Sequence, residues 1–311
     1  MKTTLPEVLV LYGGLGPERE ISLRSGKAVY NALKSNGTYP LRLYDWNGES
    51  FKDQINPRQS IVFPALHGSS GEDGTVQKML ENIGVHYAGS DSTTSSICID
   101  KVATKKALNT LDIDLAKQIV FGEQDNYNWS QIKDFLGIPI VAKPIDSGSS
   151  FGLVILNSEN DFIDLKENIS LHYPLLLESY LPGLDLTIGV VSGSPHGVIG
   201  IEPKGGYYDY AHKYQMGKTY YQCPAKIPIK TEKKIRLQAK EIVSHLGIRD
   251  FCRIDFKEDS SCNPVFLEVN TLPGLTETSL LPKSLACEGI NFEELCLLLL
   301  EPAIERFLSA E

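Results

Sequence analysis

The stretch Glu7-Val-Leu-Val-Leu-Tyr12, followed by Gly13-Gly-Leu-Gly-Pro-Glu18, indicates how the first part of the chain folds. After Glu7, apolar residues run without interruption to Tyr12, which is typical of a strand buried on both faces of a sheet. The glycines that follow predict a turn, and Pro17 is a residue that favours the first turn of a helix. A buried strand, a turn and a helix are therefore expected in this order.

The residues that follow continue this alternation of strands and helices. Apolar residues recur at helical spacing over 28–33, and Gly37 stands where such a helix would end. Residues 41–44 and 61–66 then have the character of strands. A strand-helix-strand order predicts a parallel sheet, so we expect an α/β domain over residues 1–100.

Two further modules are predicted from the rest of the chain. Residues 101–185 combine predicted strands with a Ser/Gly loop at 147–150, and residues 186–311 open with an apolar strand. Residues 203–224 are rich in tyrosine, glycine and lysine without clear periodicity, and segments of this kind are often lids. A helix with one apolar face is predicted within 235–246.

Composition and charge exclude several classes of protein. The 311 residues are 42% hydrophobic and 22% charged, which is the ordinary globular range, and their net charge of -9 provides no basic face for nucleic acid or an anionic membrane. The longest apolar stretch, 295–300, is too short to cross a membrane. The sequence enters a strand too early to carry a signal peptide. We therefore expect a soluble cytoplasmic protein whose six cysteines are buried reduced thiols.

The clearest chemistry lies in two predicted strands near the C-terminus. Arg253 alternates with Asp255 in the first strand, and Glu268 alternates with Asn270 in the second. Alternate residues of a strand share a face, so two neighbouring strands would bring these polar groups together. Carboxylate and amide oxygens without His or Cys suit Mg²⁺ that also binds substrate phosphates. A solvated sheet face with cross-strand ion pairs fits the same pattern.

A second signal is Lys143, which precedes the loop at 147–150. Backbone N–H groups and hydroxyls of such a loop can bind phosphate oxygens while the lysine supplies charge, although Gly/Ser hairpin loops are common. Two other nucleotide motifs fail. Residues 217–219 resemble the end of a P-loop, but His212 stands where its first glycine belongs. Arg19 stands where a dinucleotide fingerprint requires its third glycine.

Taken together, the motifs resemble those of the D-alanine–D-alanine ligase family of ATP-grasp enzymes. The matching segments occur in the family's order and cover nearly the whole chain: residues 13–22, 65–68, 71–75, 100–101, 143–144, 148–150, 208–210, 213–214, 253–255 and 268–271. The resemblance implies an ATP-grasp fold, with an N-terminal α/β domain over 1–100, a central subdomain over 101–185, and a C-terminal subdomain over 186–311 that carries the lid at 203–224.

The resemblance implies that ATP lies between the central and C-terminal subdomains. Lys101 and Lys143 would hold the α- and β-phosphates, and Lys213 of the lid would reach the γ-phosphate. The adenine pocket and ribose contacts would come from Glu178, Ser179, Tyr180, Leu181 and Asp185, with Ser150 and Tyr208 as further nucleotide ligands. The family usually has Glu where this chain has Asp185. Two Mg²⁺ ions, for which Mn²⁺ is an alternative, would be held by Asp255, Glu268 and Asn270.

The implied reaction joins two D-alanines through an acyl phosphate made with ATP. Glu18 would bind the ammonium group of the first D-alanine, and His67 would lie near its carboxylate. Ser279 and the Leu280 backbone would hold the second carboxylate. Further implied roles are oxyanion stabilisation by Arg253 and the Gly274 N–H, and a hydrogen-bond network of Ser149 and Tyr214 with Glu18.

The resemblance also bears on product and partners. Relatives that make the D-lactate ester carry Phe where this chain has Tyr214, which favours the dipeptide used in peptidoglycan synthesis. A related ligase that makes D-Ala-D-Ser, D-Ala-D-lactate or another dipeptide is the alternative, and a catalytically silent nucleotide-binding regulator is another. The expected partners are D-alanine and ATP, with neither nucleic acid nor membrane. Homodimers are usual in the family, and nothing in the sequence shows one.

Overall fold

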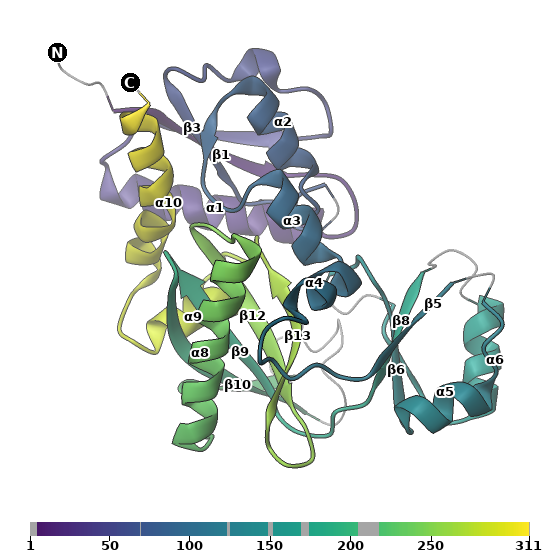
Figure 1. Ribbon diagram of the computed structural model, residues 1–311. Helices are drawn as coiled ribbons and strands as arrows, with labels where there is room; N and C mark the ends of the chain where they lie inside the picture. Colours follow the sequence, from purple (N-terminus) through teal and green to yellow (C-terminus); the bar gives the residue numbers. More distant parts are fainter. Residues whose placement is uncertain are drawn as a thin grey trace.

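The structure is a computed structural model that describes residues 5–68, 70–122, 125–148, 152–168, 174–204 and 218–310. Within these residues the chain is a mixed α/β protein built on three sheets (Figure 1). Part of the predicted lid and five predicted site residues lie outside the described residues: Ser149, Ser150, Tyr208, Lys213 and Tyr214.

The N-terminal sheet is parallel, as its strand-helix-strand sequence predicts. Its strands, in the order β2-β1-β3-β4, are β2 (Leu41–Trp46), β1 (Glu7–Gly13), β3 (Ser60–Pro64) and β4 (His86–Tyr87). β1 is a central strand with both faces buried, Val8 and Val10 in one core cluster and Leu9 and Leu11 in another, which explains its continuous apolar run. Helix α1 (Arg19–Asn36) ends at Gly37, which has a φ of 71° and donates its N–H to the Leu33 carbonyl.

Helices cover both faces of this sheet. Helices α1 and α10 (Phe292–Ser309) pack on one face, and α2 (Thr75–Ile83) packs on the other together with the loop that contains the 3-10 helix η1 (Lys52–Gln54). α10 also links this sheet to the C-terminal sheet, because Arg306 donates to both Asp250 carboxylate oxygens at 2.7 and 2.6 Å and to the Tyr87 carbonyl at 2.8 Å. The C-terminal helix α10 therefore lies beside the N-terminal sheet (Figure 1).

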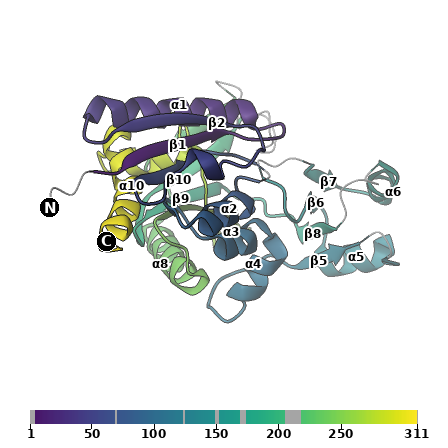
Figure 2. The ribbon, with the colours of Figure 1, turned by 90° about the horizontal axis from the view of Figure 1, so that it is seen from above.

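The central sheet is small and antiparallel. Its strands, in the order β5-β8-β6-β7, are β5 (Gln118–Phe121), β8 (Leu175–Ser179), β6 (Ile140–Pro144) and β7 (Val154–Leu156). Helices α5 (Trp129–Leu136) and α6 (Glu159–Asn168) pack on one face over buried residues that include Ile140 and Leu177. This part projects sideways from the rest of the molecule (Figure 2). Residues on its other face line the cleft described below.

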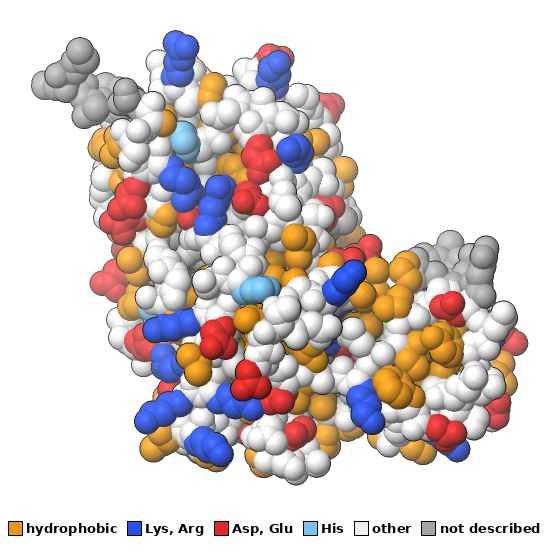
Figure 3. Space-filling view, viewed as in Figure 1, with side chains coloured by type: hydrophobic (Ala, Val, Ile, Leu, Met, Phe, Trp, Pro, Cys, Tyr) orange, Lys and Arg blue, Asp and Glu red, His pale blue; other side chains and the backbone are white. Residues whose placement is uncertain are grey.

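The C-terminal sheet is antiparallel. Its strands, in the order β11-β10-β9-β12-β13, are β11 (Thr219–Gln222), β10 (Ser194–Pro203), β9 (Asp185–Val191), β12 (Phe251–Glu258) and β13 (Pro264–Asn270). α8 (Ile229–Leu246) buries Ile235, Ala239 and Ile242 against one face, and its outer side carries exposed lysines (Figure 3). α9 (Leu280–Ala286) packs on the opposite face, where Ser284 Oγ accepts from the Gly189 N–H at 2.9 Å.

Two short helices connect the first sheet to the central one. α3 (Ser92–Ile99) is capped by Asp91, and α4 (Lys101–Leu108) is capped by Asp100, whose carboxylate accepts from the Val102 and Ala103 N–H groups. α4 thus begins at Lys101, a predicted phosphate ligand. None of the helices in the described part of the chain combines the length and the apolar character that a membrane-spanning segment requires.

The cysteine expectation is wrong for three of the six residues. Cys98, Cys252 and Cys296 are buried free thiols as expected, but Cys262 is exposed, and Cys223 and Cys287 form a disulfide. Cys223 follows β11 and Cys287 follows α9, and their Cα atoms lie 5.6 Å apart, within the range for a disulfide. The pairing joins residues 64 positions apart, so no local motif predicts it.

Candidate active site

A cleft of about 660 Å³ lies where the three sheets meet. Each predicted site residue within the described ranges lines it: Glu18, His67, Lys101, Lys143, Glu178, Ser179, Tyr180, Leu181, Asp185, Arg253, Asp255, Glu268, Asn270, Gly274, Ser279 and Leu280. These residues come from segments up to 262 positions apart (18 to 280), so only the folded chain brings them together.

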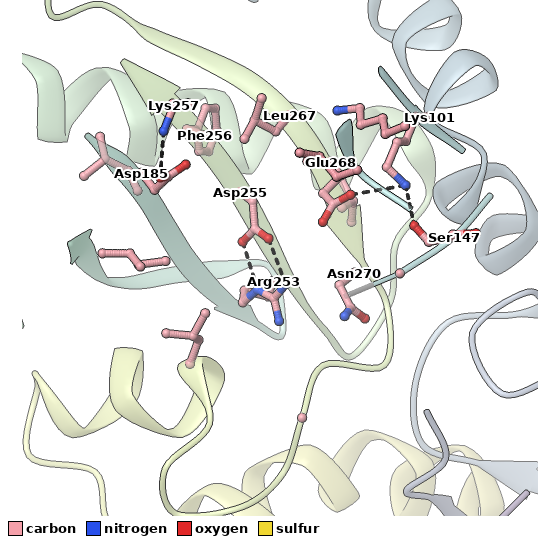
Figure 4. Close-up of a pocket in the computed structure, with 18 of the residues that line it drawn as sticks. Lys101, Ser147, Asp185, Arg253, Asp255, Phe256, Lys257, Leu267, Glu268 and Asn270 are labelled. Atoms are coloured by element: carbon pink, nitrogen blue, oxygen red, sulfur yellow. Dashed lines mark hydrogen bonds and ion pairs between the residues drawn. The ribbon is translucent and has the colours of Figure 1, made fainter. Parts of the chain in front are cut away.

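Strands β12 and β13 form one wall of the cleft (Figure 4). They are antiparallel neighbours, with Arg253 opposite Asn270 and Asp255 opposite Glu268. This pairing brings the polar side chains of the two strands together, as the alternation along each strand predicts. Arg253 donates from Nε and Nη2 to the two Asp255 carboxylate oxygens, each at 2.8 Å, and Thr187 Oγ1 donates to Asp255 Oδ1 at 2.6 Å.

The oxygens on this wall fit a magnesium site that also uses substrate phosphates. Asp255 and Glu268 supply carboxylates, and Asn270 supplies an amide oxygen that accepts from the Leu272 N–H at 2.9 Å. No cluster of three or more His, Cys, Asp or Glu suited to a metal occurs in the described ranges. A cage made only of protein carboxylates is therefore not present there, whereas Mg²⁺ commonly uses one or two carboxylates together with phosphates.

Three lysines of α4 and β6 pair with carboxylates in the cleft or directly behind its lining. Lys101 Nζ donates to the Ser147 carbonyl at 2.8 Å and lies 3.3 Å from Glu268 Oε2 (Figure 4). Lys143 Nζ lies 2.5 Å from Glu178 Oε2, and Lys105 pairs with the other oxygen, Glu178 Oε1. Lysine charges are thus held beside carboxylates at the place where phosphates are expected.

Lys105 is a part of this arrangement that the sequence interpretation missed. Its side chain is fully buried and forms an ion pair with the buried carboxylate of Glu178. The available signal was its position four residues after Lys101, which puts both side chains on one face of α4.

The far end of the same wall carries another missed residue. Lys257 Nζ donates to Asp185 Oδ2 at 2.6 Å, and both side chains line the cleft (Figure 4). Lys257 continues the alternation of Arg253 and Asp255 along β12. The two-residue period of a strand, extended by two residues beyond Asp255, therefore predicts that the Lys257 side chain faces the cleft.

The N-terminal part contributes a second wall. His67 is buried, with Nε2 2.9 Å from Ser25 Oγ and Nδ1 3.6 Å from Glu72 Oε1. Glu72 also accepts from the Gly68 N–H at 3.2 Å. Glu18 lies at the start of α1 and lines the same cleft. Glu72 belongs to a segment that carries the family resemblance, but no role was predicted for it.

The third wall is the turn before α9. Ser279 Oγ lies 2.8 Å from Thr276 Oγ1 and accepts from the Thr276 N–H at 3.1 Å. Gly274 lies against this hydroxyl, since a Cβ built on it would be 2.8 Å from Ser279 Oγ. Lys283, one helical turn after Leu280, also lines the cleft, and partial burial lowers its pKa. Hydroxyl and ammonium groups therefore face the cleft from this side.

Comparisons with known proteins agree with this layout. A family model described as D-ala D-ala ligase C-terminus matches residues 106–301, and one described as D-ala D-ala ligase N-terminus matches residues 43–90. The chain is 38% identical over 305 residues to a D-alanine–D-alanine ligase of Wolbachia sp. subsp. Drosophila simulans, covering 97% of this chain and 95% of the relative. It is 37% identical over 316 residues to the D-alanine–D-alanine ligase of Thermotoga petrophila, covering 98% of each.

Solved structures match over the same extent. The D-alanine–D-alanine ligase of Bacillus anthracis complexed with ATP has a TM-score of 0.86 at 27% identity and covers 99% of this chain and 100% of its own. The VanG D-Ala:D-Ser ligase of Enterococcus faecalis has a TM-score of 0.81 at 26% identity, with 96% of this chain and 100% of its own covered. The similarity therefore spans all three sheets.

Proposed function

Because the chain belongs to the D-alanine–D-alanine ligase family, which consists of ATP-dependent ligases, we propose that it joins two D-alanines into D-alanyl-D-alanine for peptidoglycan synthesis. The observation that carries this proposal is the convergence of groups of two kinds in one cleft. Lysines and metal-binding oxygens suited to a nucleotide lie on one side, and groups suited to amino-acid ends lie on the other. A ligase that activates a carboxylate with ATP needs both.

The nucleotide occupies the side between the central and C-terminal sheets. Adenine lies along Glu178, Ser179, Tyr180 and Leu181, and Asp185 binds the ribose hydroxyls. Lys101 and Lys143 bind the α- and β-phosphates, with Ser150, Tyr208 and Lys213 as further ligands from segments outside the described residues. The similarity to a ligase solved in complex with ATP supports this arrangement.

Two Mg²⁺ ions complete the nucleotide side of the proposal, with Mn²⁺ as a substitute. Asp255, Glu268 and Asn270 would hold them, because their oxygens line the cleft beside Lys101 and Lys143. When bound, the ions neutralise phosphate charge that would otherwise repel an incoming carboxylate.

The reaction then proceeds in two steps. A carboxylate oxygen of the first D-alanine attacks the γ-phosphorus of ATP, and ADP leaves, which yields an acyl phosphate. The amine of the second D-alanine attacks that carbonyl carbon, and the tetrahedral adduct expels inorganic phosphate after the amine has lost a proton. Negative charge develops on the carbonyl oxygen, and Arg253 and the Gly274 N–H stabilise it.

Side chains on the other two walls of the cleft orient the two amino acids. Glu18 binds the first ammonium group, His67 lies near the first carboxylate, and Ser279 with the Leu280 backbone binds the second carboxylate. Ser149 and Tyr214, outside the described residues, complete a network with Glu18 beneath the lid. Closure of the lid excludes water, which would hydrolyse the acyl phosphate.

The proposal includes the cell compartment and the assembly. We infer that the enzyme works in the cytoplasm, because its co-substrate ATP is made there. A homodimer is the assembly usual for the family, and light scattering of the purified protein tests it.

The testing experiment measures phosphate release from ATP and Mg²⁺ in the presence of D-alanine, with the product identified by mass. We expect one dipeptide for each phosphate, and D-alanine to outcompete D-serine and D-lactate as acceptor. Turnover with another acceptor but not with D-alanine would contradict the substrate assignment while retaining the ligase chemistry. Absence of ATP turnover with every acceptor would favour a silent nucleotide-binding regulator.

A further inference from the structure

Glu178 is a buried carboxylate held between two lysines. Its side chain is 3% exposed, with Oε1 bound to Lys105 and Oε2 lying 2.5 Å from Lys143 Nζ. The two lysines differ in where they stand. Lys143 is 12% exposed and lines the cleft, whereas Lys105 is 0% exposed and stands behind Glu178, away from the cleft lining.

We propose that Lys105 is a positioning residue for nucleotide binding, which stays on Glu178 as its counterion when Lys143 turns to the phosphates. This inference rests on the proposed function, which puts ATP in this cleft. The two lysines then have separate roles. Lys143 is the mobile ligand of the nucleotide, and Lys105 is the fixed partner of the carboxylate.

Glu178 would be costly to leave without a cation, because its side chain is buried. A buried carboxylate that loses its cation is strongly destabilised. The Lys143 ammonium group has three N–H donors, but a phosphate bound to it shares its single positive charge with Glu178 and so weakens the neutralisation of that carboxylate. A second cation on Glu178 offsets this loss during turnover.

Lys105 is the group positioned to do this. Lys101, the other lysine nearby, is already bound to the Ser147 carbonyl and lies beside Glu268, on the metal side of the cleft. Lys105 follows it by one helical turn on α4, and its bond to Glu178 Oε1 leaves Oε2 and Lys143 facing the cleft. Asp100 caps the start of α4, and the Lys105 pair joins this helix to β8, which carries Glu178.

The consequence of losing Lys105 follows from this geometry. In Lys105→Met, Lys143 becomes the remaining cation on Glu178, so a phosphate has to compete with a buried carboxylate for it. We expect the KM for ATP to rise by at least about tenfold. The KM for D-alanine should change little, because Glu18, His67 and Ser279 lie on other walls of the cleft.

The matched control is Lys106→Met, which removes the same kind of side chain from the next position of α4, where it is exposed. The test measures binding of the ATP analogue AMP-PNP with Mg²⁺ by calorimetry, together with both KM values. Lys105→Met should lose affinity by at least about tenfold, while Lys106→Met stays within about twofold of wild type. Equal affinity of Lys105→Met and wild type would overturn the proposal.

Rescue separates positioning from general damage to the fold. If Lys105 acts by neutralising Glu178, then adding Lys105→Met to a Glu178→Gln protein should alter AMP-PNP affinity by less than about twofold. The same loss in both backgrounds would overturn the proposal. If Lys105→Met alone does not fold, this comparison still tests the proposal. The double variant loses the lysine and the glutamate together and so has no unpaired carboxylate at position 178.

Failure of this inference differs from failure of the proposed function. A wild-type protein that neither binds AMP-PNP nor releases phosphate with D-alanine contradicts the function itself. A wild-type protein that does both, beside a Lys105→Met variant that binds AMP-PNP equally well, contradicts only the role of Lys105.

Discussion

Arg253 binds Asp255 through two parallel hydrogen bonds within a single strand. The Nε and Nη2 atoms of Arg253 each donate to a different carboxylate oxygen at 2.8 Å. The two residues are two positions apart on β12, so the strand itself directs both side chains into the cleft. The guanidinium proposed to stabilise the oxyanion and a carboxylate proposed to hold metal therefore neutralise each other in this structure.

Arg253→Met should lower kcat by a factor on the order of 10²–10³, because it removes a donor to the developing oxyanion. Phosphate release under saturating ATP and D-alanine measures this. Arg236→Met, which removes an arginine of α8 that lies outside the cleft lining, is the control and should keep kcat. A kcat near wild type in Arg253→Met would exclude this oxyanion role.

Glu268→Gln should abolish turnover and leave the fold intact, because the amide is a much weaker ligand for Mg²⁺ than the carboxylate. Phosphate release and circular dichroism measure the two effects. The control is Glu277→Gln, an exposed glutamate outside the cleft lining. If Glu268→Gln retained wild-type activity, Glu268 would not be a metal ligand.

Tyr214→Phe should shift acceptor preference from D-alanine toward D-lactate. This prediction rests on the family resemblance, since Tyr214 lies outside the described residues. The ratio of ester to dipeptide, measured by mass with both acceptors present, tests it. An unchanged ratio would show that Tyr214 does not determine the acceptor.

The Cys223–Cys287 disulfide should stabilise the oxidised protein. It links residues 64 positions apart, and the chain-entropy model gives about 4 kcal/mol for a loop of this size. Reduction by dithiothreitol should therefore lower the Tm of the wild type and leave that of Cys287→Ser unchanged. An equal response of both proteins to the reductant would argue against a stabilising disulfide.

Much of the fold follows from local pattern. The continuous apolar run of β1 predicts a buried parallel strand, and the alternation of Arg253 with Asp255 predicts a shared strand face; both are confirmed. β10 was not predicted, because Pro195, His196 and Gly197 interrupt its pattern. Local pattern also does not show which sheet a helix packs on: α10 follows the C-terminal sheet in the sequence but packs on the N-terminal sheet. The division of the chain into domains at residues 100 and 185 therefore stays a prediction.

Less of the site follows from pattern alone. The direction of Arg253, Asp255, Glu268 and Asn270 came from strand periodicity, whereas the roles given to the other residues came from the family resemblance. The burial of Lys105 and the pairing of Cys223 with Cys287 depend on contacts between segments far apart in the chain. Spacing in the sequence puts Lys105 on the same face of α4 as Lys101, but it predicts neither the burial of Lys105 nor the partner of Cys223.

The central claim is that ATP activates the carboxylate of one D-alanine before the second attacks. D-alanine labelled with oxygen-18 in its carboxylate tests it directly, with the released phosphate analysed by mass. Attack of that carboxylate on the γ-phosphorus predicts one oxygen-18 atom in each phosphate, released together with one D-alanyl-D-alanine. Unlabelled phosphate would mean that water, and not D-alanine, attacks ATP, and would contradict the account.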